Sequence, residues 1–129
     1  MKREILFRGK RTDNGEWVYG SLIDSDSIVG KIVDFDGEYF IPEFWYKVEH
    51  ETVGQFTGLT DKNGIKIFDG DVVRLYDDSE DELVNGVIVF NADFCSFCVS
   101  MKCHEDVMLM AHWQYEVIGN IYDNKELLA

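Results

Sequence analysis

Three cysteines and two histidines near the C-terminal end have residue types that could bind a metal. They are Cys95, Cys98, Cys103, His104 and His112. Zinc prefers four thiolate or imidazole ligands in a tetrahedron, and a C-x-x-C pair often supplies two of them. Here the residues between the first two cysteines are strand formers, no glycine tightens a knuckle, and no second C-x-x-C motif is present. Side chains three apart in a strand point to opposite faces. The sequence therefore favours buried, unreactive cysteines, and we predict no metal and no other cofactor.

Other chemistry of these residue types is also disfavoured. A redox-active C-x-x-C pair needs a thiolate stabilised by a helix N-terminus or by cations, whereas Asp93, Glu105 and Asp106 make this neighbourhood acidic. Calcium would suit the acids of Asp61–Gly64 or Asp69–Asp71, but neither segment has the ligand spacing of an EF-hand loop. Both segments are complete as tight turns.

No catalytic motif is recognisable. The chain lacks G-x-S-x-G, the phosphate-binding G-x-x-x-x-G-K-[ST] loop and a G-x-G-x-x-G turn after a strand. The three histidines, His50, His104 and His112, have no nucleophile signature beside them. We therefore predict that the protein is not an enzyme.

Two clusters are candidates for an interaction surface. Aromatic residues that adjoin one another could stack on bases or a sugar if exposed, although such clusters more often belong to a core or a subunit interface. Five acids within six positions have the character of a solvated loop. The candidate surface comprises Phe44, Trp45, Tyr46, Asp77, Asp78, Glu80, Asp81 and Glu82.

Composition limits the class of protein. With 129 residues, 46% apolar and 14% aromatic, the chain can form one packed domain, with two β subdomains at about 1–50 and 51–129 as an alternative. It has 25 acidic and 12 basic residues, and the net charge of −13 opposes binding to phosphates. The excess acid could also serve only solubility. No segment has the length of a membrane span or signal peptide, so we expect a cytoplasmic protein without a membrane partner.

The pattern of strands and turns predicts an all-β fold, mainly antiparallel, with small SH3-like barrel or sandwich elements. Turn signals, among them the hairpin signal Asn14-Gly15, recur about every ten residues, and there is only one proline. At most a short helix is expected, near the C-terminus at 123–128, while His104–Trp113 is compatible with either strand or helix. The expected strands are Arg3–Gly9, Glu16–Ile23, Ile28–Phe35, Glu38–Ile41, Val72–Tyr76, Val87–Phe90, Phe94–Met101 and Tyr115–Tyr122.

Three further details of this pattern are specific enough to test. Ile65 and Ile67 should share one face of a short strand, because side chains alternate along a strand. Asn85-Gly86 should mark the start of a strand. Along Phe94–Met101, the face with Cys95, Phe97, Val99 and Met101 should point to the core.

The central stretch Val53–Arg74 combines two tight turns with three short strands. Asn63-Gly64 reads as a hairpin turn because both residues tolerate positive φ, and Asp69-Gly70-Asp71 reads as a second reversal. Three short strands cannot bury an apolar face alone, so flanking segments must cover them. We therefore expect the rest of the chain to be organised around this stretch.

The segment GQFTGLTDKNGIKIFDGDVV in that stretch resembles the signature motif of the YopX family of phage and prophage proteins. The segments Lys2–Arg8 and Tyr115–Asn124 are similar to the motifs with which the family's sequences begin and end. The resemblance implies a mostly β fold, a phage or prophage origin and self-association. It implies no activity, because the family's function is not established.

Two classes of function follow as hypotheses. The first is a non-enzymatic phage or prophage accessory protein that self-associates and binds another protein, from host or phage. The alternative is a nucleic-acid-linked role, either single-strand binding through Trp17, Trp45, Tyr46 and the basic Arg8–Arg11 loop, or mimicry of DNA by the acidic surface. The acidic balance makes nucleic acid the less favoured partner.

Overall fold

The structure is a computed structural model that describes residues 3–77, 80–101, 105–110 and 114–128. Its described strand pairs are antiparallel, and the helical segments among the described residues are two short 3₁₀ turns. None of these is long and apolar enough to cross a membrane. The all-β prediction and the short helix near the C-terminus are confirmed. The elements are β1 (Phe7–Lys10), β2 (Trp17–Ile23), β3 (Ser27–Val29), β4 (Ile32–Asp36), β5 (Tyr39–Pro42), β6 (Trp45–Lys47), η1 (His50–Thr52), β7 (Gly54–Thr60), β8 (Lys66–Phe68), β9 (Asp71–Asp77), β10 (Glu80–Asn91), β11 (Ser96–Ser100), β12 (Val107–Met108), β13 (Tyr115–Asn120) and η2 (Lys125–Leu128).

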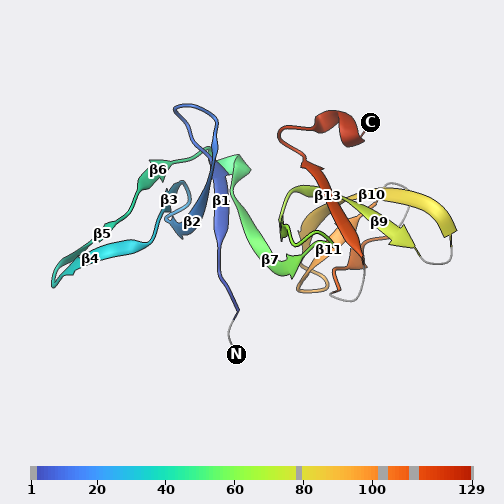
Figure 1. Ribbon diagram of the computed structural model, residues 1–129, viewed down its shortest axis with the longest axis horizontal. Helices are drawn as coiled ribbons and strands as arrows, with labels where there is room; N and C mark the ends of the chain where they lie inside the picture. The colour runs from blue at the N-terminus through green and yellow to red at the C-terminus, as the bar shows by residue number, and fades with distance from the viewer. Residues whose placement is uncertain (1–2, 78–79, 102–104, 111–113, 129) are drawn as a thin grey trace. The chain divides into compact units, whose positions relative to one another are not determined.

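The chain divides into two compact units, residues 1–56 and 57–129, with the boundary inside β7. In the first unit the strands follow the order β6-β3-β2-β1, and β1 also pairs with the start of β7. Strands β4 and β5 form a separate two-stranded sheet that extends away from β3 and β6 (Figure 1). The first unit is therefore a small sheet that carries a projecting hairpin.

The sheet of the first unit is held by a tight turn and close backbone packing. Gly15 has φ +72° in the turn between β1 and β2, as its Asn-Gly signal predicts. Ile28, Val29 and Val48 are buried. Gly9 lies against the side chain of Val48, so a Cβ there would come within 2.9 Å of it.

The second unit contains a five-stranded sheet in the order β12-β11-β10-β9-β13, which curls into part of a barrel (Figure 1). Alternate apolar residues of β8, β9, β10 and β11 point to the same side and meet Tyr115 from β13. Leu59, Phe97 and Met101 pack against this cluster. The buried residues of the core are Ile67, Val73, Leu75, Ile88, Val99 and Tyr115.

The turns of the central stretch form as predicted. Gly64 and Gly70 have φ +83° and +92°, values that favour glycine. The Asp71 carboxylate accepts a hydrogen bond of 2.7 Å from the Phe68 amide, which closes the reversal between β8 and β9. The prediction that Ile65 and Ile67 share one face of a strand is wrong, because Ile65 precedes β8 at the end of the turn and is exposed, whereas Ile67 is buried.

The β10–β11 hairpin differs from the sequence prediction. Asn85-Gly86 lies within β10 rather than at its start, and a Cβ on Gly86 would overlap the Val99 side chain. Cys95 is exposed in the turn before β11 with φ +50°, so its assignment to the core face is wrong. Val99 is buried as expected, but Cys98 on the opposite face is also fully buried. Glycine here serves close packing between strands rather than a turn.

The C-terminal segment contains the strand and helical turn that the sequence suggests. Strand β13 runs over Tyr115–Asn120, and η2 follows at Lys125–Leu128. In the stretch compatible with strand or helix, Val107–Met108 forms β12 beside β11. Extended backbone is favoured there because β11 offers a strand edge for pairing.

Candidate functional site

The aromatic trio does not form one exposed cluster. Side chains alternate near β6, so Phe44 and Tyr46 stack on each other, with ring centroids 5.5 Å apart, while Trp45 points to the other side and is 58% exposed. The Phe44 ring covers Gly30, where a Cβ would overlap it. The predicted interaction surface therefore reduces at this point to Trp45.

Cations from the same unit lie over Tyr46 and Trp17, two of the three rings that could stack on nucleic-acid bases. The Arg11 guanidinium lies 3.7 Å from the Tyr46 ring centroid and also pairs with the Asp13 carboxylate at 2.6 Å. Arg8 and Lys10 lie 4.6 and 5.6 Å from the centroid of Trp17. These intramolecular cation–π contacts occupy ring faces on which nucleic-acid bases would have to stack.

The acidic segment is not the loop that its composition suggested. Strand β9 extends to Asp77 and β10 begins at Glu80, with these two residues paired across the hairpin. The register of this pairing shifts between Glu80 and Val84. The antiparallel pairing of β9 with β10 thus continues into the acidic segment. Asp78 and the side chains of Asp77, Glu80, Asp81 and Glu82 lie outside the described residues.

The structure separates the two cysteines of the C-x-x-C pair. The Cys95 thiol is exposed, with Sγ 3.5 Å from the Ala92 carbonyl oxygen, whereas Cys98 is buried. Burial and the negative charge of Asp106 raise the pKa of the Cys98 thiol. Cys103, His104 and His112 lie outside the described residues. Among the described residues no three potential ligands come together as a metal site would require.

The feature that sequence reasoning missed is the exposure of the β4–β5 hairpin, residues Ile32–Pro42, which we call the apolar arm. Each described residue of its two strands except Pro42 is exposed, and Phe35 reaches 71%. A two-stranded sheet has no partner layer of its own, so both faces meet solvent. The signal in the sequence was the presence of apolar residues on both faces of the two expected strands, Ile28–Phe35 and Glu38–Ile41. The exposed apolar side chains are Ile32, Val33, Phe35, Tyr39, Phe40 and Ile41.

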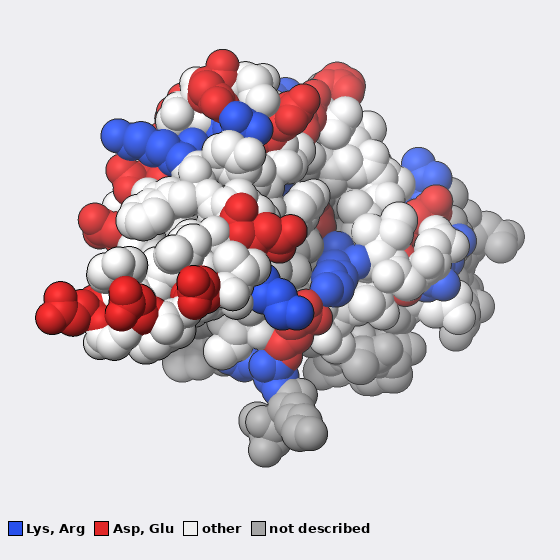
Figure 2. Space-filling view, turned by 60° about the vertical axis from the view of Figure 1, so that its left-hand side comes forward, with Lys and Arg blue, Asp and Glu red and all other residues white. Residues whose placement is uncertain are grey.

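Register divides the arm into two chemically different faces. Phe35 pairs with Phe40, and Ile32 pairs with Pro42; paired residues share a face, and residues two apart along β5 do too. These four residues form the inner face, which carries no charge. The outer face is mixed and consists of Asp34, Asp36, Tyr39 and Ile41. Figure 2 shows how acidic side chains and uncharged surface alternate on this side of the molecule.

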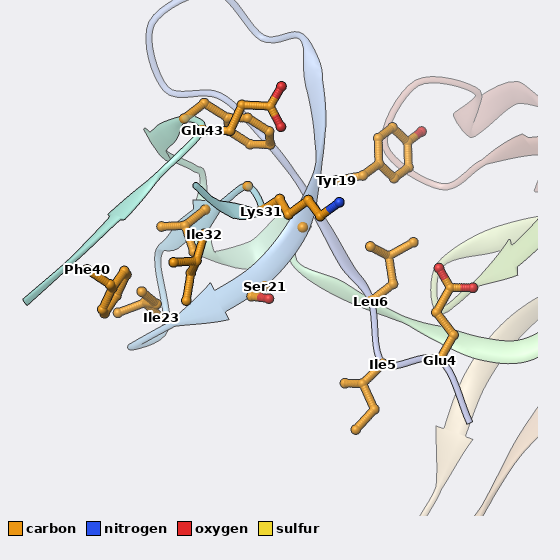
Figure 3. A pocket seen from close by; sticks show the side chains of 14 residues that line it. Glu4, Ile5, Leu6, Tyr19, Ser21, Ile23, Lys31, Ile32, Phe40 and Glu43 are labelled. Atoms are coloured by element: carbon orange, nitrogen blue, oxygen red, sulfur yellow. The ribbon is translucent and has the colours of Figure 1, made fainter. Parts of the chain in front are cut away.

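An open cavity of about 830 Å³ begins where the arm leaves the sheet. Its walls include Ile32 and Phe40 of the inner face, Ser21 and Ile23 of β2, and Leu6 ahead of β1. Figure 3 shows Phe40, Ile23 and Ile32 at one end, with Leu6 at the other and Ser21 between them. The cavity is thus continuous with the inner face of the arm, and we call it the arm-root cavity.

Charged groups of the arm-root cavity stand around its apolar walls. Lys31 extends across the opening, Glu43 lies above it and Glu4 lies at the end near Leu6 (Figure 3). Its size is within the usual range of ligand-binding clefts, about 300–1,000 Å³. Apolar walls with a charged rim suit an apolar side chain or segment rather than a highly charged ligand.

Comparison with known proteins places the chain in a family. A solved structure, "Crystal structure of protein EF1440 from Enterococcus faecalis", is similar with a TM-score of 0.64 and 22% sequence identity, over 99% of this chain and 100% of that chain. This likeness supports the same fold. A search of curated proteins found no match. The family model described as "YopX protein" matches residues 6–129. The chain therefore belongs to the YopX family.

Proposed function

We propose that this YopX-family chain is a non-enzymatic, self-associating protein-binding domain, and that the apolar arm is its association surface. The observation that supports this proposal is the exposure of the arm on both faces. Phe35, Tyr39 and Phe40 are 71%, 59% and 37% exposed. Because an aromatic side chain can bury about 150–250 Å², these three alone expose roughly 300 Å². The aliphatic residues enlarge the patch to a size that marks interaction sites.

Strand edges support the same proposal. The two-stranded sheet of β4 and β5 has no third strand among the described residues, so its outer edges carry backbone groups that a further strand can pair with. The acids Asp34, Asp36 and Glu38 in this hairpin keep it from pairing indiscriminately. An exposed apolar surface flanked by charge is typical of a specific interface.

The wider role follows from the family resemblance and the composition. A phage or prophage accessory protein would act in the cytoplasm, on itself and on a host or phage protein, without membrane contact. The net charge of −13 favours a basic or uncharged partner. Nucleic acid is disfavoured by this charge and by the cations on Trp17 and Tyr46.

Native mass spectrometry and light scattering of the wild type and two variants test the proposal. We expect a discrete oligomer for the wild type and dissociation for Phe35→Glu. An interfacial aromatic contributes about 1.5–3 kcal/mol, so association should weaken at least tenfold. Phe94→Glu is the matched control, because Phe94 is 51% exposed but lies in the turn before β11.

Circular dichroism should show that both variants keep the strand content of the wild type. A wild type that stays monomeric at high concentration refutes self-association. An oligomer that tolerates Phe35→Glu as well as Phe94→Glu refutes the arm as the association surface.

A further inference from the structure

We propose that the arm-root cavity of one copy receives the apolar arm of a second copy. This inference rests on the proposed self-association and specifies which surfaces meet. Its starting point is the continuity between the cavity and the inner face of the arm, since Ile32 and Phe40 belong to both. An occupant of the cavity would therefore also contact the inner face beyond it.

The cavity requires an occupant with an extended, uncharged apolar surface. The inner face of another copy offers this surface, because Ile32, Phe35, Phe40 and Pro42 follow one another without a charged residue. Of the chain's own arm, only Ile32 and Phe40 line the cavity. Phe35 is not among its walls and is the most exposed of the arm's aromatic residues, so it is accessible to a neighbouring copy.

The charges of the arm are compatible with this docking. Asp34 and Asp36 lie on the outer face, so they stay in solvent when the inner face is covered. Lys31 at the cavity opening can lie near these acids, while Glu4 and Glu43 stand on the rim. Charged rims around an apolar centre are the usual arrangement at protein interfaces.

The area also suffices for a stable contact. Phe35 and Phe40 of the inner face expose roughly 200 Å², and with Ile32 each arm–cavity contact buries roughly 250 Å² of the arm and a similar area of cavity wall. Each copy donates one arm and receives one, so the two copies of a reciprocal dimer share two contacts. Together these two contacts bury about 1,000 Å² in total, about 500 Å² per copy, which reaches the minimum of about 1,000 Å² expected of a specific interface.

Site-specific cross-linking tests which surfaces meet. Phe35 is replaced by the photoreactive benzoylphenylalanine, and ¹⁴N- and ¹⁵N-labelled copies are mixed before irradiation and peptide mass mapping. We expect mixed-isotope cross-links from position 35 to Ser21, Ile23 or Lys31 of the other copy. Benzoylphenylalanine at position 94 is the control and should give no such products. Cross-links from position 35 only to other surfaces would overturn the inference.

A mixing experiment gives an independent test. Ser21→Trp places a large side chain in the cavity and should weaken self-association at least tenfold, while its arm stays intact. Phe35→Glu has the opposite defect, with a damaged arm and an intact cavity. Mixing the two variants should restore a 1:1 complex with one arm–cavity contact, measured by native mass spectrometry.

The outcomes separate this inference from the proposed function. A monomeric wild type would refute both the proposed self-association and the arm–cavity contact. If the wild type is an oligomer but Ser21→Trp associates as well as the wild type does, only the arm–cavity contact is refuted. The same holds if the mixture of Ser21→Trp with Phe35→Glu forms no complex. Circular dichroism of Ser21→Trp establishes that its β-sheet is retained, and the cross-linking result does not depend on that variant.

Discussion

The Asp61 carboxylate links several backbone segments of the second unit, so its removal should measurably lower the free energy of unfolding. Its Oδ1 accepts hydrogen bonds from the backbone amides of Asn63 at 2.8 Å and Ile65 at 2.9 Å. Its Oδ2 accepts one from the Val117 amide at 3.0 Å. The side chain is 6% exposed. One carboxylate thus holds the β7–β8 turn and attaches it to β13.

Replacement of Asp61 should lower the free energy of unfolding by an amount set by these three bonds. A hydrogen bond to a charged group contributes about 1.5–3 kcal/mol, but water can reach the exposed Asn63 and Ile65 amides after substitution. We therefore expect Asp61→Ala to cost about 2–4 kcal/mol. Asp61→Asn should cost about 1–2 kcal/mol, because it keeps one acceptor oxygen but turns an NH₂ group toward amide donors.

The effect should depend on pH in a defined direction. Burial alone would raise the pKa of Asp61, but the amides of Val117, Ile65 and Asn63, with the positive charge of Lys62, hold this pKa below its ordinary value. The contribution of the carboxylate is therefore complete above the unfolded pKa of about 3.9 and is lost as the pH falls through the lower folded pKa. The stability gap between the wild type and Asp61→Asn should shrink below about pH 4.

Urea unfolding followed by circular dichroism at neutral and acidic pH measures both effects. Asp93→Asn is the matched control, because Asp93 is an exposed aspartate of the same unit, and it should change stability by less than about 0.5 kcal/mol. Equal stability of Asp61→Asn and the wild type at pH 7 would refute the reasoning. A stability gap that stays constant down to pH 3 would refute the part that concerns charge.

Three further predictions concern packing, thiol reactivity and association. Gly86→Ala should cost about 1–3 kcal/mol in urea unfolding because its Cβ would overlap the neighbouring strand β11, whereas Gly37→Ala, with no atom within 4 Å of its Cβ, should be nearly neutral. Iodoacetamide should label Cys95 quickly and Cys98 only on unfolding, because Cys98 is buried and its thiol pKa is raised by that burial; equal rates by peptide mass mapping would contradict this. Raising the ionic strength from about 0.01 M to about 0.1 M should increase the oligomeric fraction in light scattering, since a Debye length reduced from about 30 Å to about 10 Å screens the repulsion between acidic copies; dissociation by salt would contradict an apolar interface.

Local rules in the sequence were sufficient for the turns. Asn14-Gly15 and Asn63-Gly64 predicted hairpins because few residues other than glycine adopt positive φ without strain, and both glycines have that conformation. The same logic located the reversal at Gly70. The strands expected over Glu16–Ile23 and Tyr115–Tyr122 are present as β2 and β13, and the signature segment pointed to the family that the matched family model shows.

The same rules failed where distant segments decide the environment. Asn85-Gly86 has the composition of a turn, yet Gly86 lies within β10 because the Val99 side chain leaves no room for a Cβ. Cys98 lies opposite the core face of β11 but is buried, which alternation alone cannot predict. Pairing between strands far apart in the sequence outweighs the local signal in both cases.

The candidate site depended most on tertiary structure. The sequence by itself predicted strands rich in apolar residues over Ile28–Phe35 and Glu38–Ile41, joined by a turn, and such segments usually lie in a core. Only the tertiary structure decided that these strands pair with each other and with no third strand in the described part of the chain. Exposure depends on which segments cover a surface, and that is a property of the whole fold rather than of local composition.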